Sequence, residues 1–189
     1  MASIRETLQA KVRQVFEEFP QARFAMANEG SFGPHPFFGV PSNHEAFLCK
    51  ERDRPYEIFV DHLSTEVHHF EYRVNPGDDW EALLKKTRFP SHALCIQREG
   101  DPVPFQTAIR SRHRLEEALR RISRLPGPPR TLLLSADLRA HLNPTRMEVI
   151  RQLGKKLIDR ISSLCPSCYQ PGFWTEKPGE GAPCPACNS

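Results

Sequence analysis

Thr131-Leu-Leu-Leu-Ser135, followed by Ala136-Asp-Leu-Arg-Ala-His-Leu-Asn-Pro-Thr-Arg146, is the stretch that best indicates the fold class of this 189-residue chain. Its first five residues are apolar enough for a buried strand. Asn143 is a preferred N-cap and Pro144 is preferred at a first helical position, so we expect a helix from here to about residue 163. Apolar residues then recur every three or four positions, at Met147, Ile150, Leu153, Leu157, Ile158 and Ile161. A strand leading directly into an amphipathic helix is typical of an α/β protein.

The remainder of the first 163 residues alternates between strand-like and helix-like patterns. Residues 3–18 carry an apolar stripe at helical spacing, and Pro20 ends it. Asp78 is the expected N-cap of a second helix that runs to residue 86. Residues 29–43 are rich in Gly and Pro and are expected to form a loop. The other predicted elements are a helix at 112–125 and strands at 23–28, 45–50, 56–63, 67–74, 92–97 and 131–135, which together give a mixed sheet with flanking helices.

Four cysteines at the end of the chain form two C-x-x-C pairs. Cys165-Pro-Ser-Cys168 is separated by fifteen residues from Cys184-Pro-Ala-Cys187, a spacing that predicts a four-thiolate zinc site. The intervening segment has too few apolar residues for a core, so the metal would hold it together. We therefore expect a mixed α/β domain over residues 1–163 and a zinc ribbon over 164–189. A redox pair or disulfides are the alternatives, and a closed Cys₄ site leaves no position for a substrate.

The composition indicates a protein of the cytoplasm. No apolar run is long enough to span a membrane, and residues 1–6 carry charges without the apolar core of a secretory signal. Cys49 and Cys95 stand singly in apolar stretches and are expected to be reduced core residues. The net charge of +3 does not demand a nucleic-acid partner, although the arginines between residues 110 and 130 form either solvated helix faces or a polyanion-binding surface.

The first polar cluster lies in Asn28-Glu-Gly-Ser-Phe-Gly-Pro-His-Pro36. Glu29, Ser31 and His35 fall within seven residues, and the two glycines permit close approach of the backbone to a ligand. We expect a functional loop at the exit of a strand. The alternative is an ordinary Pro/Gly turn.

The second cluster lies between the strand at 131–135 and the long helix. In an extended segment Asp137, Arg139 and His141 would share one face. Arg146 falls in the first turn of the helix, so Arg139, Arg146 and the helix N–H groups suit a bound phosphate or carboxylate. Asp137 would then bind a metal ion or orient His141. The alternative is an N-capped helix with a local ion pair between Asp137 and Arg139.

A third group of polar residues follows the strand at 56–63. Asp61 and Glu66 are candidate ligands of a second Mg²⁺ or Mn²⁺ ion, because these cations prefer oxygen ligands. His68 and His69 are adjacent, so on a strand they would face opposite sides. Hydrogen-bonding or surface roles are the alternative for all four residues.

These motifs resemble an uncharacterised bacterial family, a domain of unknown function that ends in a zinc ribbon. The resemblance covers most of the chain. It implies that one site contains Glu29, Ser31, His35, Glu66, Asp137, Arg139, His141, Asn143 and Arg146. It supplies no reaction. Family members begin with a further segment rich in Gly, Lys and acidic residues ahead of the position of Ile4, so a binding-only version and a truncated form are the two expectations for this chain. A more distant similarity, in the order of elements around Glu29-Gly30, is to house-cleaning nucleoside triphosphate pyrophosphatases.

The favoured function from these observations is a metal-dependent phosphohydrolase that acts on a nucleotide or related phosphate compound. Glu29 with Asp137 or Glu66 would hold Mg²⁺ or Mn²⁺, and His35 or His141 would move the proton. Substrate binding would fall to Ser31, Arg139, Asn143 and Arg146. Two alternatives stay open: a nucleic-acid or protein binding module that uses the ribbon and the basic helices, and a sensor that binds a small anion without turnover.

Overall fold

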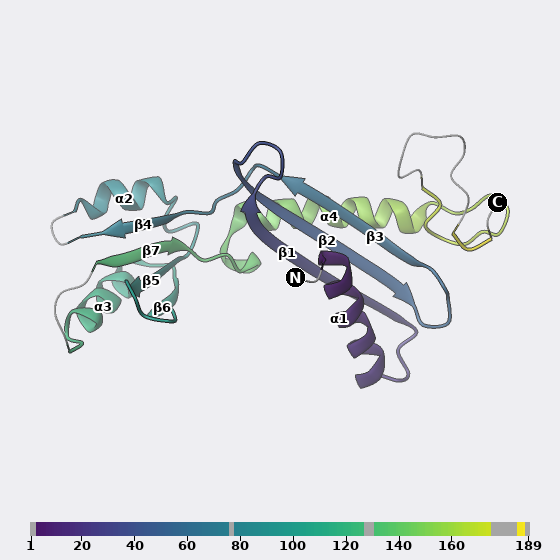
Figure 1. Cartoon of the computed structure of the whole chain (residues 1–189), viewed down its shortest axis with the longest axis horizontal. Helices are drawn as coiled ribbons and strands as arrows, with labels where there is room; N and C mark the ends of the chain where they lie inside the picture. The colour runs from purple at the N-terminus through teal and green to yellow at the C-terminus, as the bar shows by residue number, and fades with distance from the viewer. Residues whose placement is uncertain (1–2, 76–77, 127–130, 175–184, 188–189) are drawn as a thin grey trace. The chain divides into compact units, whose positions relative to one another are not determined.

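The computed structural model describes residues 3–75, 78–126, 131–174 and 185–187. Its contacts divide the chain into two compact units, residues 1–65 with 149–189 and residues 66–148. The first unit contains one sheet and the second contains another (Figure 1). The mixed α/β class is therefore confirmed, with the strands divided between two sheets whose pairings are antiparallel.

The sheet of the first unit is a meander of three long strands. β1 (Phe24–Pro34) pairs with β2 (Pro41–Glu51), which pairs with β3 (Glu57–Ser64). The loop predicted for residues 29–43 is wrong, because β1 continues to Pro34 and only residues 35–40 form the turn. Gly30 pairs with Glu45 of β2 and Gly33 with Ser42, and this tertiary pairing overrides their low strand propensity. Gly39 closes the turn with φ of 66°.

One face of this sheet is covered by α1 (Ile4–Glu18). The helix begins with a capping box in which Ser3 Oγ accepts from the Glu6 N–H and the Glu6 carboxylate accepts from the Ser3 N–H. Leu8 and Val12 of the helix are buried against small or apolar side chains of β1 and β2. These side chains are Ala25, Ala27, Ala46 and Leu48. The helix predicted at residues 3–18 is confirmed.

The other face of β2 and β3 packs against α4 (Pro144–Ser162). Leu153 and Leu157 are buried with Val60, and Phe47 and Ile58 pack against them. Lys156 Nζ donates to the carbonyl of Asp61 at 3.0 Å, which fixes the helix along the strand. The helix predicted from residue 144 is confirmed, and its first five residues belong to the second unit.

The second unit is a four-stranded sheet with two helices. The strand order is β4 (Glu71–Val74), β7 (Leu132–Ala136), β5 (Leu94–Arg98) and β6 (Gln106–Ile109). The helices α2 (Trp80–Lys86) and α3 (Arg112–Ser123) share one core with the sheet, built around Leu94, Ile96 and Leu134. Because β5 and β7 pack against these two helices, their sequences are short runs of mostly apolar residues.

Local boundaries differ from the sequence expectations in three places. Asp79 caps α2 in place of Asp78, because its carboxylate accepts from the Glu81 and Ala82 N–H groups at 2.9 and 3.1 Å. Of the strand expected at 67–74, only residues 71–74 form a strand, β4. The strand β6 was not predicted.

The predicted boundary between a domain at 1–163 and a ribbon at 164–189 stays a prediction. Within the described ranges, no helix has the length and apolarity needed to cross a membrane.

The packing of α1 on the first sheet makes a stability prediction. Leu8 is completely buried, so Leu8→Ala should lower the free energy of unfolding by about 2–5 kcal/mol. Phe37→Ala is the matched control, because Phe37 is 86% exposed at the β1–β2 turn and its loss should change stability by less than about 0.5 kcal/mol. Urea denaturation of the two variants measures both values, and equal losses would contradict this account of the core.

Candidate metal centre and polar clusters

Three of the four predicted zinc ligands gather at one point. The ligand atoms of Cys165, Cys168 and Cys187 all lie within 4.8 Å of one another. The fourth predicted ligand, Cys184, lies outside the described residues. Among the residues that the structure describes, no second group of three His, Cys, Asp or Glu ligands comes this close together.

The geometry of the three thiols fits a tetrahedral metal site. With metal–sulfur bonds of about 2.3 Å, the sulfurs of such a site stand about 3.8 Å apart. Cys165 Sγ and Cys187 Sγ are 3.6 Å apart. Backbone N–H groups of Cys168 and Ser167 point at Cys165 Sγ and lower the pKa of this thiol, which favours the thiolate form that binds metal. The cysteines are thus placed to bind a metal such as zinc.

Hydrogen bonds and side-chain contacts hold the segment that carries Cys165 and Cys168 against other parts of the first unit. The Cys165 N–H donates to the Gln170 carbonyl at 2.9 Å, and the Gln170 side chain accepts from the Tyr56 hydroxyl at 3.1 Å. Gly172 adopts φ of 91° directly against Ile58. The Trp174 ring lies 5.7 Å from the guanidinium carbon of Arg160, so this aromatic is engaged with α4.

The buried carboxylate of Asp137 is the centre of the second polar cluster. It is 3% exposed and accepts from Arg139 Nε at 2.9 Å and Arg139 Nη2 at 2.6 Å. The Ala108 N–H also donates to it, at 3.0 Å. Burial by itself would raise the pKa of Asp137, but the hydrogen bonds from Arg139 and Ala108 outweigh it and lower the pKa to about 2. Asp137 is therefore ionised and fully engaged at neutral pH.

The Asp137 carboxylate affects two neighbouring residues, Ala108 and Cys95. Ala108 has φ of 55°, a left-handed conformation that is unfavourable for a residue with a Cβ, and its N–H is the one that Asp137 accepts. Burial, and then the charge of Asp137, raises the pKa of the Cys95 thiol to about 12. Cys95 is thus a protonated core residue, and both Cys95 and the half-buried Cys49 are free of disulfides, as the sequence predicted.

The N-terminus of α4 is capped by protein groups. Asn143 Oδ1 accepts from the Arg146 N–H at 3.1 Å, and His92 Nε2 accepts from the Thr145 N–H at 3.3 Å. The His92 ring also lies 4.3 Å from the ring of buried His68, whose Nε2 donates to the Thr87 carbonyl at 2.8 Å. Asn143 is an N-cap, as predicted. The N–H groups that were expected to face a phosphate already have partners here.

His141 leaves the face that it was expected to share with Asp137 and Arg139. Residues Ala140–Leu142 form a turn of 3₁₀ helix, so the strict alternation predicted for an extended segment is wrong at this point. The His141 side chain is exposed. Arg146 Nη1 donates to the Leu138 carbonyl at 2.6 Å, which ties the helix to the segment before it.

The first polar cluster lies on the β1–β2 hairpin of the first unit. Glu29 is ion-paired with Lys11 of α1 at 2.6 Å, and Ser31 is exposed on β1. His35 stabilises the turn itself, because its Nδ1 accepts from the Phe37 N–H at 3.2 Å and its ring stacks on Phe38. The catalytic and substrate-binding roles predicted for these residues stay predictions.

The two candidate ligands of a second metal ion fall in different units, Asp61 in the first and Glu66 in the second. Asp61 Oδ2 lies 2.9 Å from His44 Nε2 across β2 and β3, and Glu66 is exposed. Sequence reasoning missed His44 because it placed the neighbouring residues in a loop. It also missed His92, whose partner Thr145 is 53 residues away.

The chain belongs to a protein family whose function is unknown. A family model described as a domain of unknown function, DUF6671, matches residues 13–189. This confirms the resemblance to an uncharacterised family with a cysteine-rich end. No curated protein and no solved structure matches the chain, so the similarity to nucleoside triphosphate pyrophosphatases has no support.

The cysteine cluster predicts that the purified chain carries one tightly bound metal ion. Cys165→Ser should lower the metal content well below one equivalent, whereas Cys95→Ser should leave it unchanged because Cys95 lies in the other unit. Cobalt substitution followed by absorption spectroscopy reports thiolate ligation directly. Full metal content in the Cys165→Ser protein would contradict the assignment.

The cap formed by His92 predicts a pH-dependent stability. Burial, followed by the neighbouring His68 and Arg88, lowers the pKa of His92 from 6.5 to about 4. Between these two values the unfolded chain binds the proton and the folded chain does not, so stability is full above pH 6.5 and falls as the pH drops toward 4.

The matched variant for this test is His92→Gln, which keeps a hydrogen-bond acceptor and removes the titration. The difference between the denaturation midpoints of the two proteins across this pH interval reports the titration of His92 together with its coupling to His68. The variant should show a shallower fall. Parallel curves would refute the role given to His92.

Proposed function

We propose that the protein binds a small molecule that carries a phosphate or carboxylate, and that Arg139 is the group that contacts this anion. The observation that carries the proposal is the fixed, half-exposed guanidinium of Arg139, whose side chain is 51% exposed while its partner carboxylate is 3% exposed. A guanidinium matches the geometry of phosphate and carboxylate oxygens, and a buried carboxylate that holds it in one geometry preorganises it for such a ligand.

Arg139 retains hydrogen-bonding capacity after pairing with Asp137. A guanidinium has five N–H donors, and the Asp137 carboxylate engages two of them, on Nε and Nη2. The remaining donors lie on a side chain that has already lost its rotational freedom, so an arriving oxyanion meets a preorganised partner. In this arrangement Asp137 is a positioning residue for Arg139.

Binding without turnover is favoured over hydrolysis by the partners of the acidic residues. Glu29 is paired with Lys11, Asp61 with His44, and Asp137 with Arg139. A divalent cation would have to displace these protein partners before it could be held by the carboxylates. This supports the role of a small-anion sensor.

The metal-dependent phosphohydrolase is the second candidate. It is favoured by the chemistry of the buried Asp137 carboxylate, since Mg²⁺ and Mn²⁺ prefer oxygen ligands of this kind. Phosphate release from a nucleotide panel with either metal, compared with the Glu29→Ala protein, separates the two candidates. Turnover that is lost in the variant would establish the hydrolase.

The binding proposal is tested by calorimetric titration of the full chain with pyrophosphate. Arg139→Ala should weaken binding by about tenfold or more, because it removes charge-assisted hydrogen bonds. Arg139→Lys should weaken binding as well, since an ammonium cannot bridge Asp137 and the anion in the same fork geometry.

Arg114→Ala is the matched control, an exposed arginine on α3 that is expected to leave the affinity unchanged. Equal affinities of the wild-type and Arg139→Ala proteins would overturn the proposal. An equal loss in the Arg114→Ala protein would overturn it too, because attraction by net charge alone would then account for binding.

A further inference from the structure

We propose that a second binding site, for a small aromatic carboxylate, lies in the cavity between α2 and the start of α3. The cavity has a volume of about 810 Å³ and belongs entirely to the second unit. None of its lining residues is part of the Asp137–Arg139 cluster, so this site is separate from the one proposed for phosphate.

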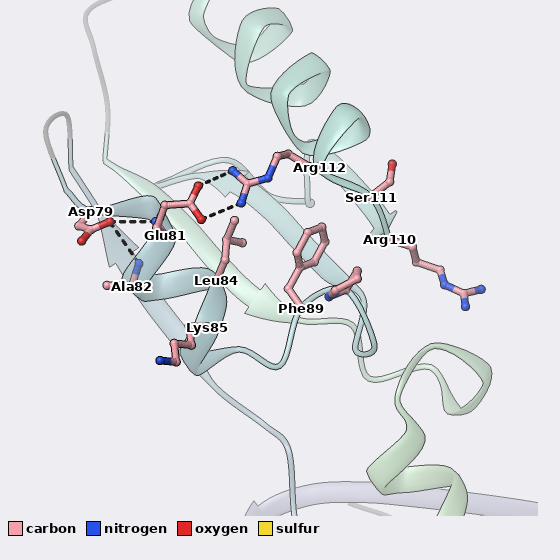
Figure 2. A pocket seen from close by; sticks show the side chains of 10 residues that line it. Asp79, Glu81, Ala82, Leu84, Lys85, Phe89, Arg110, Ser111 and Arg112 are labelled. Carbon is pink, nitrogen blue, oxygen red and sulfur yellow. Dashed lines mark hydrogen bonds and ion pairs between the residues drawn. The ribbon is translucent and has the colours of Figure 1, made fainter.

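The floor of the cavity is apolar. Leu84 and Ala82 come from α2, and Phe89 and Pro90 come from the segment that follows it. Figure 2 shows Leu84 and Phe89 lying between the two helices, beneath the bridge that Arg112 makes to Glu81. A floor of one aromatic ring and aliphatic carbons suits the flat face of an aromatic ligand.

The acidic groups of the cavity are already neutralised or hydrogen-bonded. Asp79 Oδ1 caps α2 by accepting from the Glu81 and Ala82 N–H groups. The Glu81 carboxylate accepts from both terminal nitrogens of Arg112, one of them at 2.7 Å, and this hydrogen bonding lowers the pKa of Glu81. Neither acid therefore needs a cation from a ligand.

Two of the basic side chains that line the cavity, unlike the acids, have no partner among the described residues. Lys85 and Arg110 both line the cavity and are exposed, and neither side chain has an ion-pair or hydrogen-bond partner among the residues that the structure describes. In Figure 2 the Lys85 side chain extends from α2 and the Arg110 side chain extends from the segment just before α3, with Phe89 between them. Uncompensated cations beside an apolar floor are complementary to a ligand with an aromatic body and an anionic group.

The start of α3 adds to this preference for an anion. Ser111, the N-cap of α3, also lines the cavity, so the positive end of the helix dipole lies at its rim. Two flexible cations and a helix end favour a single carboxylate over a cation or a neutral polar group. An apolar floor selects against an anion without an aromatic body, such as inorganic phosphate.

The test uses 2-naphthoate as the probe and the full chain with Trp174 replaced by Phe. The chain has two tryptophans, so this leaves Trp80, which stands between the lining residues Asp79 and Glu81, as the sole reporter. Saturable quenching of Trp80 fluorescence measures binding. In the same background, Lys85→Ala with Arg110→Ala should weaken binding by about tenfold, the factor that corresponds to about 1.4 kcal/mol.

Four controls accompany this experiment. Arg114→Ala should bind 2-naphthoate as the parent does, and 2-naphthalenemethanol, which has the same ring without the charge, should bind about tenfold more weakly. Arg139→Ala should leave naphthoate binding unchanged, and the Lys85/Arg110 double variant should leave pyrophosphate binding unchanged. The two proposals can therefore fail separately.

The proposal is overturned if 2-naphthoate does not quench Trp80 saturably. It is also overturned if the double variant binds as tightly as the parent, or if the neutral alcohol binds as tightly as the carboxylate. The last result would mean that the cavity is an apolar depression without charge selectivity.

Discussion

The burial of one ionised carboxylate, that of Asp137, is the constraint on which the second unit depends. A carboxylate that is only 3% exposed is costly unless every lone pair is engaged, and here β6 and the segment after β7 supply the donors. The same contacts hold Ala108 in a left-handed conformation and fix the direction of Arg139. A structural requirement for hydrogen bonds thus leaves an oriented arginine on the surface.

The first backbone N–H groups of α4 are also hydrogen-bonded to side chains of the protein. Its first N–H groups are taken up by Asn143 and by the neutral ring of His92, and His92 in turn packs against His68. The helix continues from these contacts into the first unit, where Leu153 and Leu157 join the core of the three-stranded sheet. One of its two capping groups, the ring of His92, is titratable, which makes the beginning of α4 sensitive to acid.

Much of the fold could be predicted from local patterns in the sequence. The helical stripe of residues 3–18 and the Asn-Pro start of α4 are set by near neighbours, and both are confirmed. The strand that continues through Gly30 and Gly33 could not be predicted, because its stability comes from pairing with β2. The strand β6, with its strained Ala108, was missed for a comparable reason, since a carboxylate 29 residues away holds it.

For the functional sites, spacing in sequence was informative only where the ligands are close neighbours. Cys165 and Cys168 form a knuckle because two residues separate them, and the structure brings Cys187 to them. The pairing of Asp137 with Arg139, given as the alternative in the sequence interpretation, is a two-residue contact of the same kind. The cavity beside Lys85 and Arg110 joins residues from two helices and carries no motif, so tertiary structure alone reveals it.

The central claim is that Arg139, oriented by Asp137, contacts the bound anion. The most direct measurement is the NMR signal of the Arg139 Nε–H group, assigned by its loss in the Arg139→Lys protein, during titration with pyrophosphate. Because this N–H is hydrogen-bonded to Asp137, the signal should be protected from exchange at neutral pH and should shift progressively until the site is saturated. An Arg139 signal that stays unchanged while pyrophosphate binds elsewhere would contradict the account.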